Sequence, residues 1–308
     1  MSLRKSRLNL KNIHIPDRYN YIACFLTLKC NFHCQYCINR VGCRRDHGQI
    51  LLSGKDWVKI LNRLEAREDL PITLQGGEPS LHPDFIWIIN NINPRLHIDI
   101  LTNLSFDINK FIKEINPSRL KRKSPYPSIR VGYHPAYLDL NDLIKKTMKL
   151  KQSGFSIGVY GILHPNLFVR KQILDAQVEC RKLGIDFRTK EFLGTYKGKI
   201  YGTYKYPEAI DSRKKKECLC RTTELIIGPE AGIFKCHYDL YNNNFQVGNL
   251  LNEDYRIKDV YRACNNLGAC NSCDIKIKTN RFSIYGHTSV EIKQDPSPSV
   301  KRRINKNK

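Results

Sequence analysis

Cysteines are the residues of this chain best suited to chemistry, and they fall largely into two groups far apart in the sequence. The first group is Cys30, Cys34 and Cys37, with three and then two residues between successive thiols. Three thiolates are one too few to close a tetrahedral zinc site or to saturate a 4Fe–4S cluster. One iron of such a cluster would stay open to another ligand. The alternative is a structural zinc loop with Cys43 or His33 as the fourth ligand.

The elements that position this loop are predicted from hydropathy and turn residues. Apolar stretches predict strands at 21–28, 71–75, 96–101, 129–133, 155–163 and 185–192. Helices are predicted at 53–64, 84–92, 107–115, 140–153 and 169–183. Such alternation is typical of an α/β fold with a parallel sheet and right-handed crossovers, here a partial (β/α)6 TIM-type barrel. Functional side chains should then gather at the carboxyl ends of the strands.

A second motif follows the second predicted strand, which ends in Gly76, Gly77, Glu78 and Pro79. With this segment, and with the aromatic Tyr36 before the last cysteine of the loop, the chain resembles the radical S-adenosylmethionine (SAM) superfamily. The resemblance covers the whole predicted barrel. It implies that the three cysteines hold a 4Fe–4S cluster whose free iron chelates the amino and carboxylate groups of SAM. The GGEP backbone would then meet the methionine amine, with Glu78 nearby.

The resemblance also implies a reaction. An electron from the cluster would cleave SAM to a 5′-deoxyadenosyl radical, which would take a hydrogen atom from a substrate that the sequence does not identify. An electron donor such as flavodoxin or ferredoxin is the expected partner. Thr102 and Asn103 end the third predicted strand, where relatives place polar contacts to the SAM ribose. They complete the expected cofactor-binding set with Tyr36 and the GGEP residues.

Candidate catalytic residues follow the later strands. His134 and His164 each precede a proline at the end of the fourth and fifth predicted strands, and both could contact SAM or substrate or transfer a proton. The alternative is that each histidine simply begins a solvated loop. Glu191 and Lys190 end the sixth strand and are expected either to line the site or to pair with each other.

The second cysteine group lies in the tail of the chain and comprises Cys218, Cys220, Cys236, Cys264, Cys270 and Cys273. A predicted β-hairpin between Cys220 and Cys236, followed by a C-x2-C pair, resembles the SPASM/twitch extension of radical SAM enzymes. The resemblance implies an auxiliary 4Fe–4S cluster held by Cys236, Cys270 and Cys273 with Cys218 or Cys220. It leaves Cys264 as a spare thiol, or as a ligand if a second auxiliary cluster exists. A structural zinc ribbon is the alternative, since four thiolates at these spacings suit zinc equally well.

The remaining thiols are expected to play other parts. Cys24 lies inside an apolar strand and Cys180 on the apolar face of a helix, so both are predicted to be core residues. Cys43 is not expected to be a ligand. The predicted organisation is a basic arm at 1–18, the barrel at 19–195, a linker with a small cysteine-rich α+β domain at 196–292, and a flexible basic tail at 293–308.

Composition sets the limits of these interpretations. The 308 residues are 41% hydrophobic and carry a formal net charge of +23. We expect a cytoplasmic protein, because the chain shows neither a signal peptide nor a stretch apolar enough to span a membrane. The expected substrate is a small metabolite such as a sugar or nucleotide. The basic charge leaves two alternatives: modification of RNA or of a peptide with a structural zinc tail, and a non-enzymatic zinc protein that binds nucleic acid.

Overall fold

The computed structural model describes residues 11–39, 51–210, 216–280 and 283–293, with the side chains of 279–286 left out. Its centre is a nine-stranded sheet in the order β14-β13-β12-β2-β4-β5-β6-β7-β8. The last six of these strands are mutually parallel and alternate with helices, which confirms the predicted α/β pattern. They are β2 (Tyr21–Thr27), β4 (Ile72–Gly76), β5 (Ile98–Thr102), β6 (Ile129–Tyr133), β7 (Ile157–Leu163) and β8 (Asp186–Glu191).

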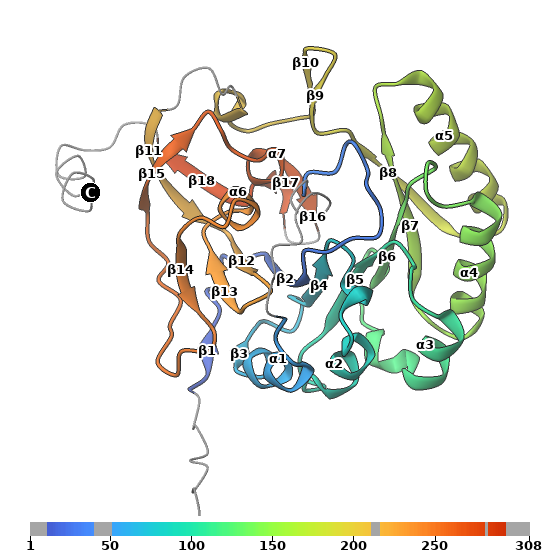
Figure 1. The fold of residues 1–308 in the computed structure, drawn as a ribbon, viewed down its shortest axis with the longest axis horizontal. Helices are drawn as coiled ribbons and strands as arrows, with labels where there is room; N and C mark the ends of the chain where they lie inside the picture. The colour runs from blue at the N-terminus through green and yellow to red at the C-terminus, as the bar shows by residue number, and fades with distance from the viewer. Residues whose placement is uncertain (1–10, 40–50, 211–215, 281–282, 294–308) are drawn as a thin grey trace, which may run out of the picture.

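Five helices connect these strands and lie along one side of them (Figure 1). They are α1 (Gly54–Leu61), α2 (Phe85–Asn91), α3 (Ile108–Glu114), α4 (Leu140–Gln152) and α5 (Leu167–Lys182), with 3-10 turns η1 (Pro79–Leu81) and η2 (Pro117–Leu120). Side chains cap several of them; Asp107 accepts from two amides of α3, and Asn166 from two amides of α5. Apolar residues of the helices and of alternate strand positions form one large buried core between the two layers.

The first helix is shorter than predicted. Ser53 caps it and its hydroxyl donates to Asp56, as expected, but α1 ends at Leu61. Leu64 belongs instead to a short strand, β3 (Leu64–Glu65), which pairs in parallel with β1 (Ile13–His14). The reason lies in Arg63, whose buried guanidinium donates to four backbone carbonyls: those of Lys11, Leu250, Asn252 and Glu253. Part of the expected basic arm therefore packs on the core, and Ile13 and Ile15 are buried.

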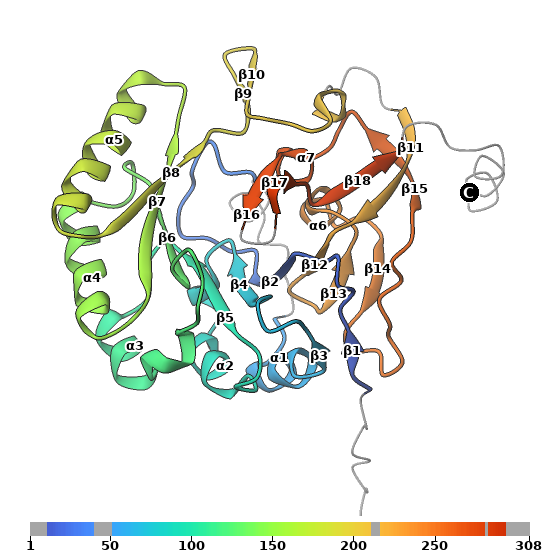
Figure 2. The same cartoon turned by 180° about the vertical axis from the view of Figure 1, so that it is seen from behind.

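The tail of the chain continues the central sheet. Strand β12 (Glu224–Ile227) pairs in parallel with β2, the first strand of the parallel set. Strands β13 (Gly232–Phe234) and β14 (Gln246–Asn249) then add antiparallel pairs, and β12–β13 is the predicted hairpin. In the view from behind, these strands lie on the opposite side of the molecule from α4 and α5 (Figure 2). The tail therefore joins the sheet at the edge nearest the cysteine loop.

The rest of the tail forms smaller sheets and turns. Strand β15 (Arg262–Leu267), β11 (Lys216–Thr222) and β18 (Val290–Lys293) form a three-stranded antiparallel sheet with its own small core. The other elements are the hairpins β9 (Gly194–Tyr196) with β10 (Lys199–Tyr201) and β16 (Lys278–Asn280) with β17 (Ser283–His287), the 3-10 turn η3 (Pro207–Ile210), and the short helices α6 (His237–Tyr241) and α7 (Ser272–Ile275). Nothing is described of residues 294–308, where the basic tail was predicted.

Candidate active site

The cysteine loop begins where β2 ends, so Cys30, Cys34 and Cys37 lie at the carboxyl end of the parallel strands, as predicted. All three thiols are half-exposed. The loop is folded on itself, because the amide of Cys37 donates to the Cys34 carbonyl over 3.0 Å. Asn31 fastens it to the end of β5 through Asn103, whose side-chain amide donates to Asn31 over 2.9 Å. The alternative zinc ligand Cys43 lies outside the described residues.

Gly76 and Gly77 are where the GGEP segment meets this loop. A Cβ atom on Gly76 would lie 2.0 Å from the carbonyl oxygen of Thr27, and one on Gly77 would lie 2.1 Å from that of Lys29. Only glycine allows the two backbones to approach so closely. The amides of Gly77 and Glu78 use this proximity and donate to the same two carbonyls over 3.0 and 2.8 Å. The GGEP segment therefore fixes the path of the chain immediately before Cys30.

The carboxylate of Glu78 is buried and fully hydrogen-bonded. It accepts from the Ser80 hydroxyl (2.6 Å) and amide (3.2 Å), from the Thr102 hydroxyl (2.8 Å) and from the Asn103 amide (2.7 Å). Burial raises the pKa of Glu78, and these hydrogen bonds act in the opposite direction. Three residues predicted to surround the cofactor are thus brought together, and Glu78 joins the ends of β4 and β5 beneath the loop.

His134 is also placed against the cysteine loop. Its Nδ1 lies 2.9 Å from the Tyr36 hydroxyl and 3.4 Å from the Cys34 Sγ. Gly132, two residues earlier on β6, makes room for the ring, since a Cβ there would lie 2.9 Å from its Nε2. Burial lowers the pKa of His134 to about 4, so the imidazole is neutral near pH 7. A neutral ring held in this way orients Tyr36 and the loop.

A cavity of about 630 Å³ opens between the cysteine loop and the tail. Its wall includes Cys34, Cys37 and Tyr36 from the loop, His164 from the end of β7, and Cys270 from the tail. The ring of His164 lies within 5.4 Å (between centroids) of Tyr36, Phe192 and Tyr196. Its Nδ1 accepts from the Asn166 amide, which leaves Nε2 to carry the proton of the neutral ring. Of the three catalytic candidates, His164 is the one that lines this cavity.

Glu191, the third catalytic candidate, is bound to residues of the tail. Its carboxylate lies 3.4 Å from the Lys276 ammonium and accepts from the Thr203 hydroxyl over 3.1 Å. Both partners belong to the tail, so Glu191 ties the end of β8 to that part of the chain. It makes no pair with Lys190 in the described residues, one of the two expectations for this position.

The six tail cysteines separate into different surroundings. Cys218 and Cys220 are buried on one face of β11, and Cys264 on β15 is the direct cross-strand partner of Cys218. The sulfur atoms of these three residues lie within 4.8 Å of one another, close enough for one metal ion. Hydrogen bonds from Cys218 and Cys220 lower the pKa of Cys264, and Lys235 adds to this effect. Cys264, for which the sequence left open a spare thiol or a ligand of a second cluster, therefore belongs to a close group of three thiols in the described part of the chain.

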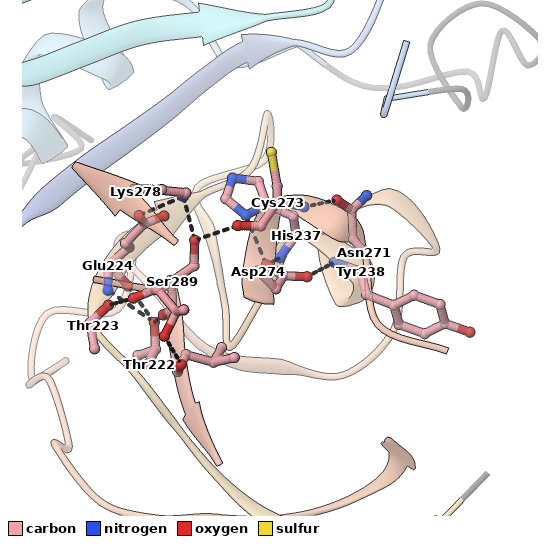
Figure 3. Close-up of polar contacts among 12 residues, drawn as sticks. Thr222, Thr223, Glu224, His237, Tyr238, Asn271, Cys273, Asp274, Lys278 and Ser289 are labelled. Carbon is pink, nitrogen blue, oxygen red and sulfur yellow. Dashed lines mark hydrogen bonds and ion pairs between the residues drawn. The ribbon is translucent and has the colours of Figure 1, made fainter. Parts of the chain in front are cut away.

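The other three tail cysteines lie outside this close group. Cys236 and Cys270 pack against the same small core. Asp274, next to Cys273, accepts from the amides of His237 and Tyr238, so it joins the start of α6 to α7 (Figure 3). The sulfur of Cys273 points away from that carboxylate (Figure 3). Cys37 of the loop and Cys270 of the tail line the same cavity, so the two cysteine groups approach each other there.

Cys24 and Cys180 are fully buried in the main core, as predicted. Burial raises the pKa of both thiols, that of Cys180 to about 11. Neither is available as a ligand, because a buried thiol with a raised pKa stays protonated and inert.

Comparison with known proteins agrees with this geometry. Residues 25–164, which include the loop, the GGEP segment and both histidines, match the family described as Radical SAM superfamily. This part of the chain is a radical SAM domain. The family implies a 4Fe–4S cluster and SAM as cofactors.

Individual relatives are distant. The chain is 22% identical over 219 residues to a GTP 3′,8-cyclase of Clostridium perfringens, covering 66% of both proteins. It is 28% identical over 124 residues to the mycofactocin maturase MftC of Mycobacterium tuberculosis, covering 40% of this chain and 29% of that one. The chain thus spans two thirds or less of these relatives. A solved structure of histidine-tagged anSMEcpe with bound AdoMet shares the fold, with a TM-score of 0.50, 13% identity, and coverage of 78% of this chain and 79% of the other.

Across the described ranges, no helix has both the length and the hydropathy needed to cross a bilayer.

Proposed function

We propose that this protein is a radical SAM enzyme that cleaves SAM reductively and takes a hydrogen atom from an unidentified small-molecule substrate. When bound, a 4Fe–4S cluster and SAM supply the electron and the 5′-deoxyadenosyl radical for this chemistry. The supporting observation is that the cysteine loop is fixed against Gly76 and Gly77 at the carboxyl end of the strands, and opens onto a cavity of about 630 Å³.

The residues of this chain then have distinct tasks. Cys30, Cys34 and Cys37 would hold the cluster, and the Gly77 region would receive the methionine end of SAM. Glu78 acts through Thr102 and Asn103 rather than on the substrate, because protein donors already occupy its carboxylate. His164, Phe192 and Tyr196 provide an aromatic wall on which a substrate or the adenosyl group can pack. Flavodoxin or ferredoxin is the proposed source of the electron.

We propose further that the six parallel strands form a partial TIM-type barrel and that the tail is a twitch-like domain with an auxiliary 4Fe–4S cluster. Cys270 supports this, because it lines the same cavity as Cys34 and Cys37. An auxiliary cluster at this place could accept an electron from a substrate radical or bind the substrate.

Zinc is the second candidate for the tail site, and one distance favours it. The sulfur atoms of Cys218 and Cys220 lie 3.6 Å apart. Two thiolates on one tetrahedral zinc, each about 2.3 Å from the ion, are separated by about 3.8 Å.

The experiment is anaerobic incubation of the reconstituted protein with SAM and dithionite, followed by chromatography of the products. We expect 5′-deoxyadenosine and methionine from the unmutated protein and neither from a protein in which Cys30, Cys34 and Cys37 are all replaced by alanine. Equal amounts from both proteins would refute the proposed function.

A further inference from the structure

The side of the parallel strands that faces away from the helices carries charged and aromatic residues. Ile129, Val159 and Phe187 belong to the core between sheet and helices. Side chains alternate along a strand, so Arg130, Tyr160 and Lys190 project to the opposite side. Lys276 and Lys278 of the tail belong to the same region, because the positive charge of each lowers the pKa of Lys190.

Positive charge exceeds negative charge here. Asp99 is shared by two guanidinium groups, those of Arg122 at 2.7 Å and Arg130 at 3.1 Å. Glu191 pairs with Lys276 at 3.4 Å, and Glu224 with Lys278 at 2.9 Å. Asp186, on the same side of β8 as Lys190, pairs with Arg188 at 2.8 Å. These four carboxylates therefore face five cations before Lys190 is counted. In addition, the Arg130 Nε is buried and has no hydrogen-bond partner.

Lys190 is the cation left without an anion. In the described part of the chain its ammonium contacts only the ring of Tyr160, at 4.6 Å from the centroid, and makes no ion pair. The side chain is exposed, yet burial, followed by the charges of Arg130, Lys276 and Lys278, lowers its pKa to about 8. Lys190 is therefore open to solvent while several other cations lie around it. Lys278, by contrast, is satisfied by Glu224 and Ser289 (Figure 3).

We propose that Lys190, with Arg130 beside it, binds an anionic group of the substrate, either a carboxylate or a phosphate. An exposed ammonium that makes no ion pair is a ready partner for such a group, and a lysine serves as a point charge for phosphate. The position suits a substrate, because Phe192, two residues further along the chain, lines the cavity beside Cys34 and Cys37. This inference rests on the proposed function and names the class of its substrate.

The test uses calorimetric titration of the full, anaerobically reconstituted protein with two probes, inorganic phosphate and succinate. We expect at least one probe to bind to the unmutated protein, and Lys190→Gln to weaken that binding about tenfold or more. Lys190→Arg, which keeps the charge, should bind within a few-fold of the unmutated protein. The matched control is Lys145→Gln, which removes the same charge from an exposed position on α4 and should have no effect.

The outcomes separate the alternatives. Binding of phosphate alone assigns a phosphorylated substrate, and binding of succinate alone assigns a carboxylate. The proposal is overturned if neither probe binds, or if Lys190→Gln binds as tightly as the unmutated protein. Lys190→Met, which retains the aliphatic stem, replaces the glutamine variant if melting shows that variant to be unfolded. SAM cleavage by the unmutated protein is measured separately, so binding without cleavage refutes the proposed function alone, and cleavage without Lys190-dependent binding refutes this inference alone.

Discussion

The two cysteine groups of this protein occupy opposite kinds of environment. The loop cysteines are half-exposed, lie on irregular backbone after β2, and have two members on the wall of the cavity. The cysteines of β11 and β15 lie on paired strands, and their sulfur atoms are within 4.8 Å of one another. Glycines and hydrogen bonds position the backbone of the loop. Strand pairing positions the backbone of the tail group, by which we mean here Cys218, Cys220 and Cys264.

This difference indicates a division of labour. A centre that admits SAM, as we propose for the loop, needs an open face, and the loop provides one. A group of closely spaced thiols within a small core is suited to holding a metal that stabilises the surrounding strands. Changes in the loop should therefore affect chemistry more than stability, and changes in the tail group should affect stability first.

The largest expected effect is the loss of SAM cleavage in Cys37→Ala. Production of 5′-deoxyadenosine should fall to the background of protein without iron, because the cluster loses one of its three ligands. The melting temperature should change little, since the thiol is half-exposed and on a loop. Cys180→Ala, which truncates a buried thiol in α5, is the control and should keep its activity. If Cys37→Ala cleaves SAM as fast as the unmutated protein, the loop cysteines do not serve the chemistry and the proposed difference between the loop and tail cysteines is wrong.

The second effect concerns the tail group. Cys264→Ala should destabilise the metal-loaded protein by about 3 kcal/mol or more, because it removes one of three thiols that lie close enough to hold one metal ion. Cys180→Ala should cost about 1 kcal/mol, the value of a small truncation in a core. After treatment with a chelator the two variants should differ little in denaturant unfolding. A difference that survives chelation would show that Cys264 stabilises by packing alone.

A smaller effect is expected from Glu78→Gln, which tests how the loop is supported. An amide can no longer accept hydrogen bonds at both atoms, so the donors from Ser80, Thr102 and Asn103 cannot all be satisfied. We expect a loss of about 1–3 kcal/mol in unfolding free energy and weaker binding of SAM in equilibrium dialysis. Glu114→Gln, at an exposed position on α3, should be neutral. If Glu78→Gln keeps the stability and the SAM affinity of the unmutated protein, Glu78 does not help to hold the site in place.

The smallest effect is expected for His164→Ala. Loss of its ring contacts should weaken binding of SAM or substrate by about 1 kcal/mol, or about fivefold. His97→Ala, next to the opposite end of β5, is the matched control. If both variants bind SAM equally well and turn over alike, the aromatic wall has no role in the site.

Much of the domain around the loop could be predicted from sequence, for local reasons. Each parallel strand is a short apolar run bounded by turn residues, and β6 matches its predicted bounds at both ends. The cysteine spacing and the GGEP segment located the loop and its support. Asn31 was missed because a single asparagine in a polar loop gives no signal until its partner at Asn103 is known.

Long-range pairing could not be predicted. The segment at 224–227 was recognised as a strand, but the sequence does not show that it pairs with β2, about 200 residues earlier. The grouping of Cys264 with Cys218 depends in the same way on the register of β11 and β15. The end of α1 was misjudged because Leu64 continues the apolar spacing of the helix, whereas the carbonyls bound by Arg63 come from distant segments.

The most direct test of two separate metal centres is a metal count. The unmutated protein and the variant with alanine at positions 30, 34 and 37 are reconstituted anaerobically, and iron, sulfide and zinc are measured per chain. We predict about eight irons in the unmutated protein and about four in the variant, one cluster having been lost. If the unmutated protein holds four irons and the variant none, and both hold zinc, the tail site binds zinc instead of a cluster. The same iron content in both proteins would contradict the assignment of the open cluster to the loop.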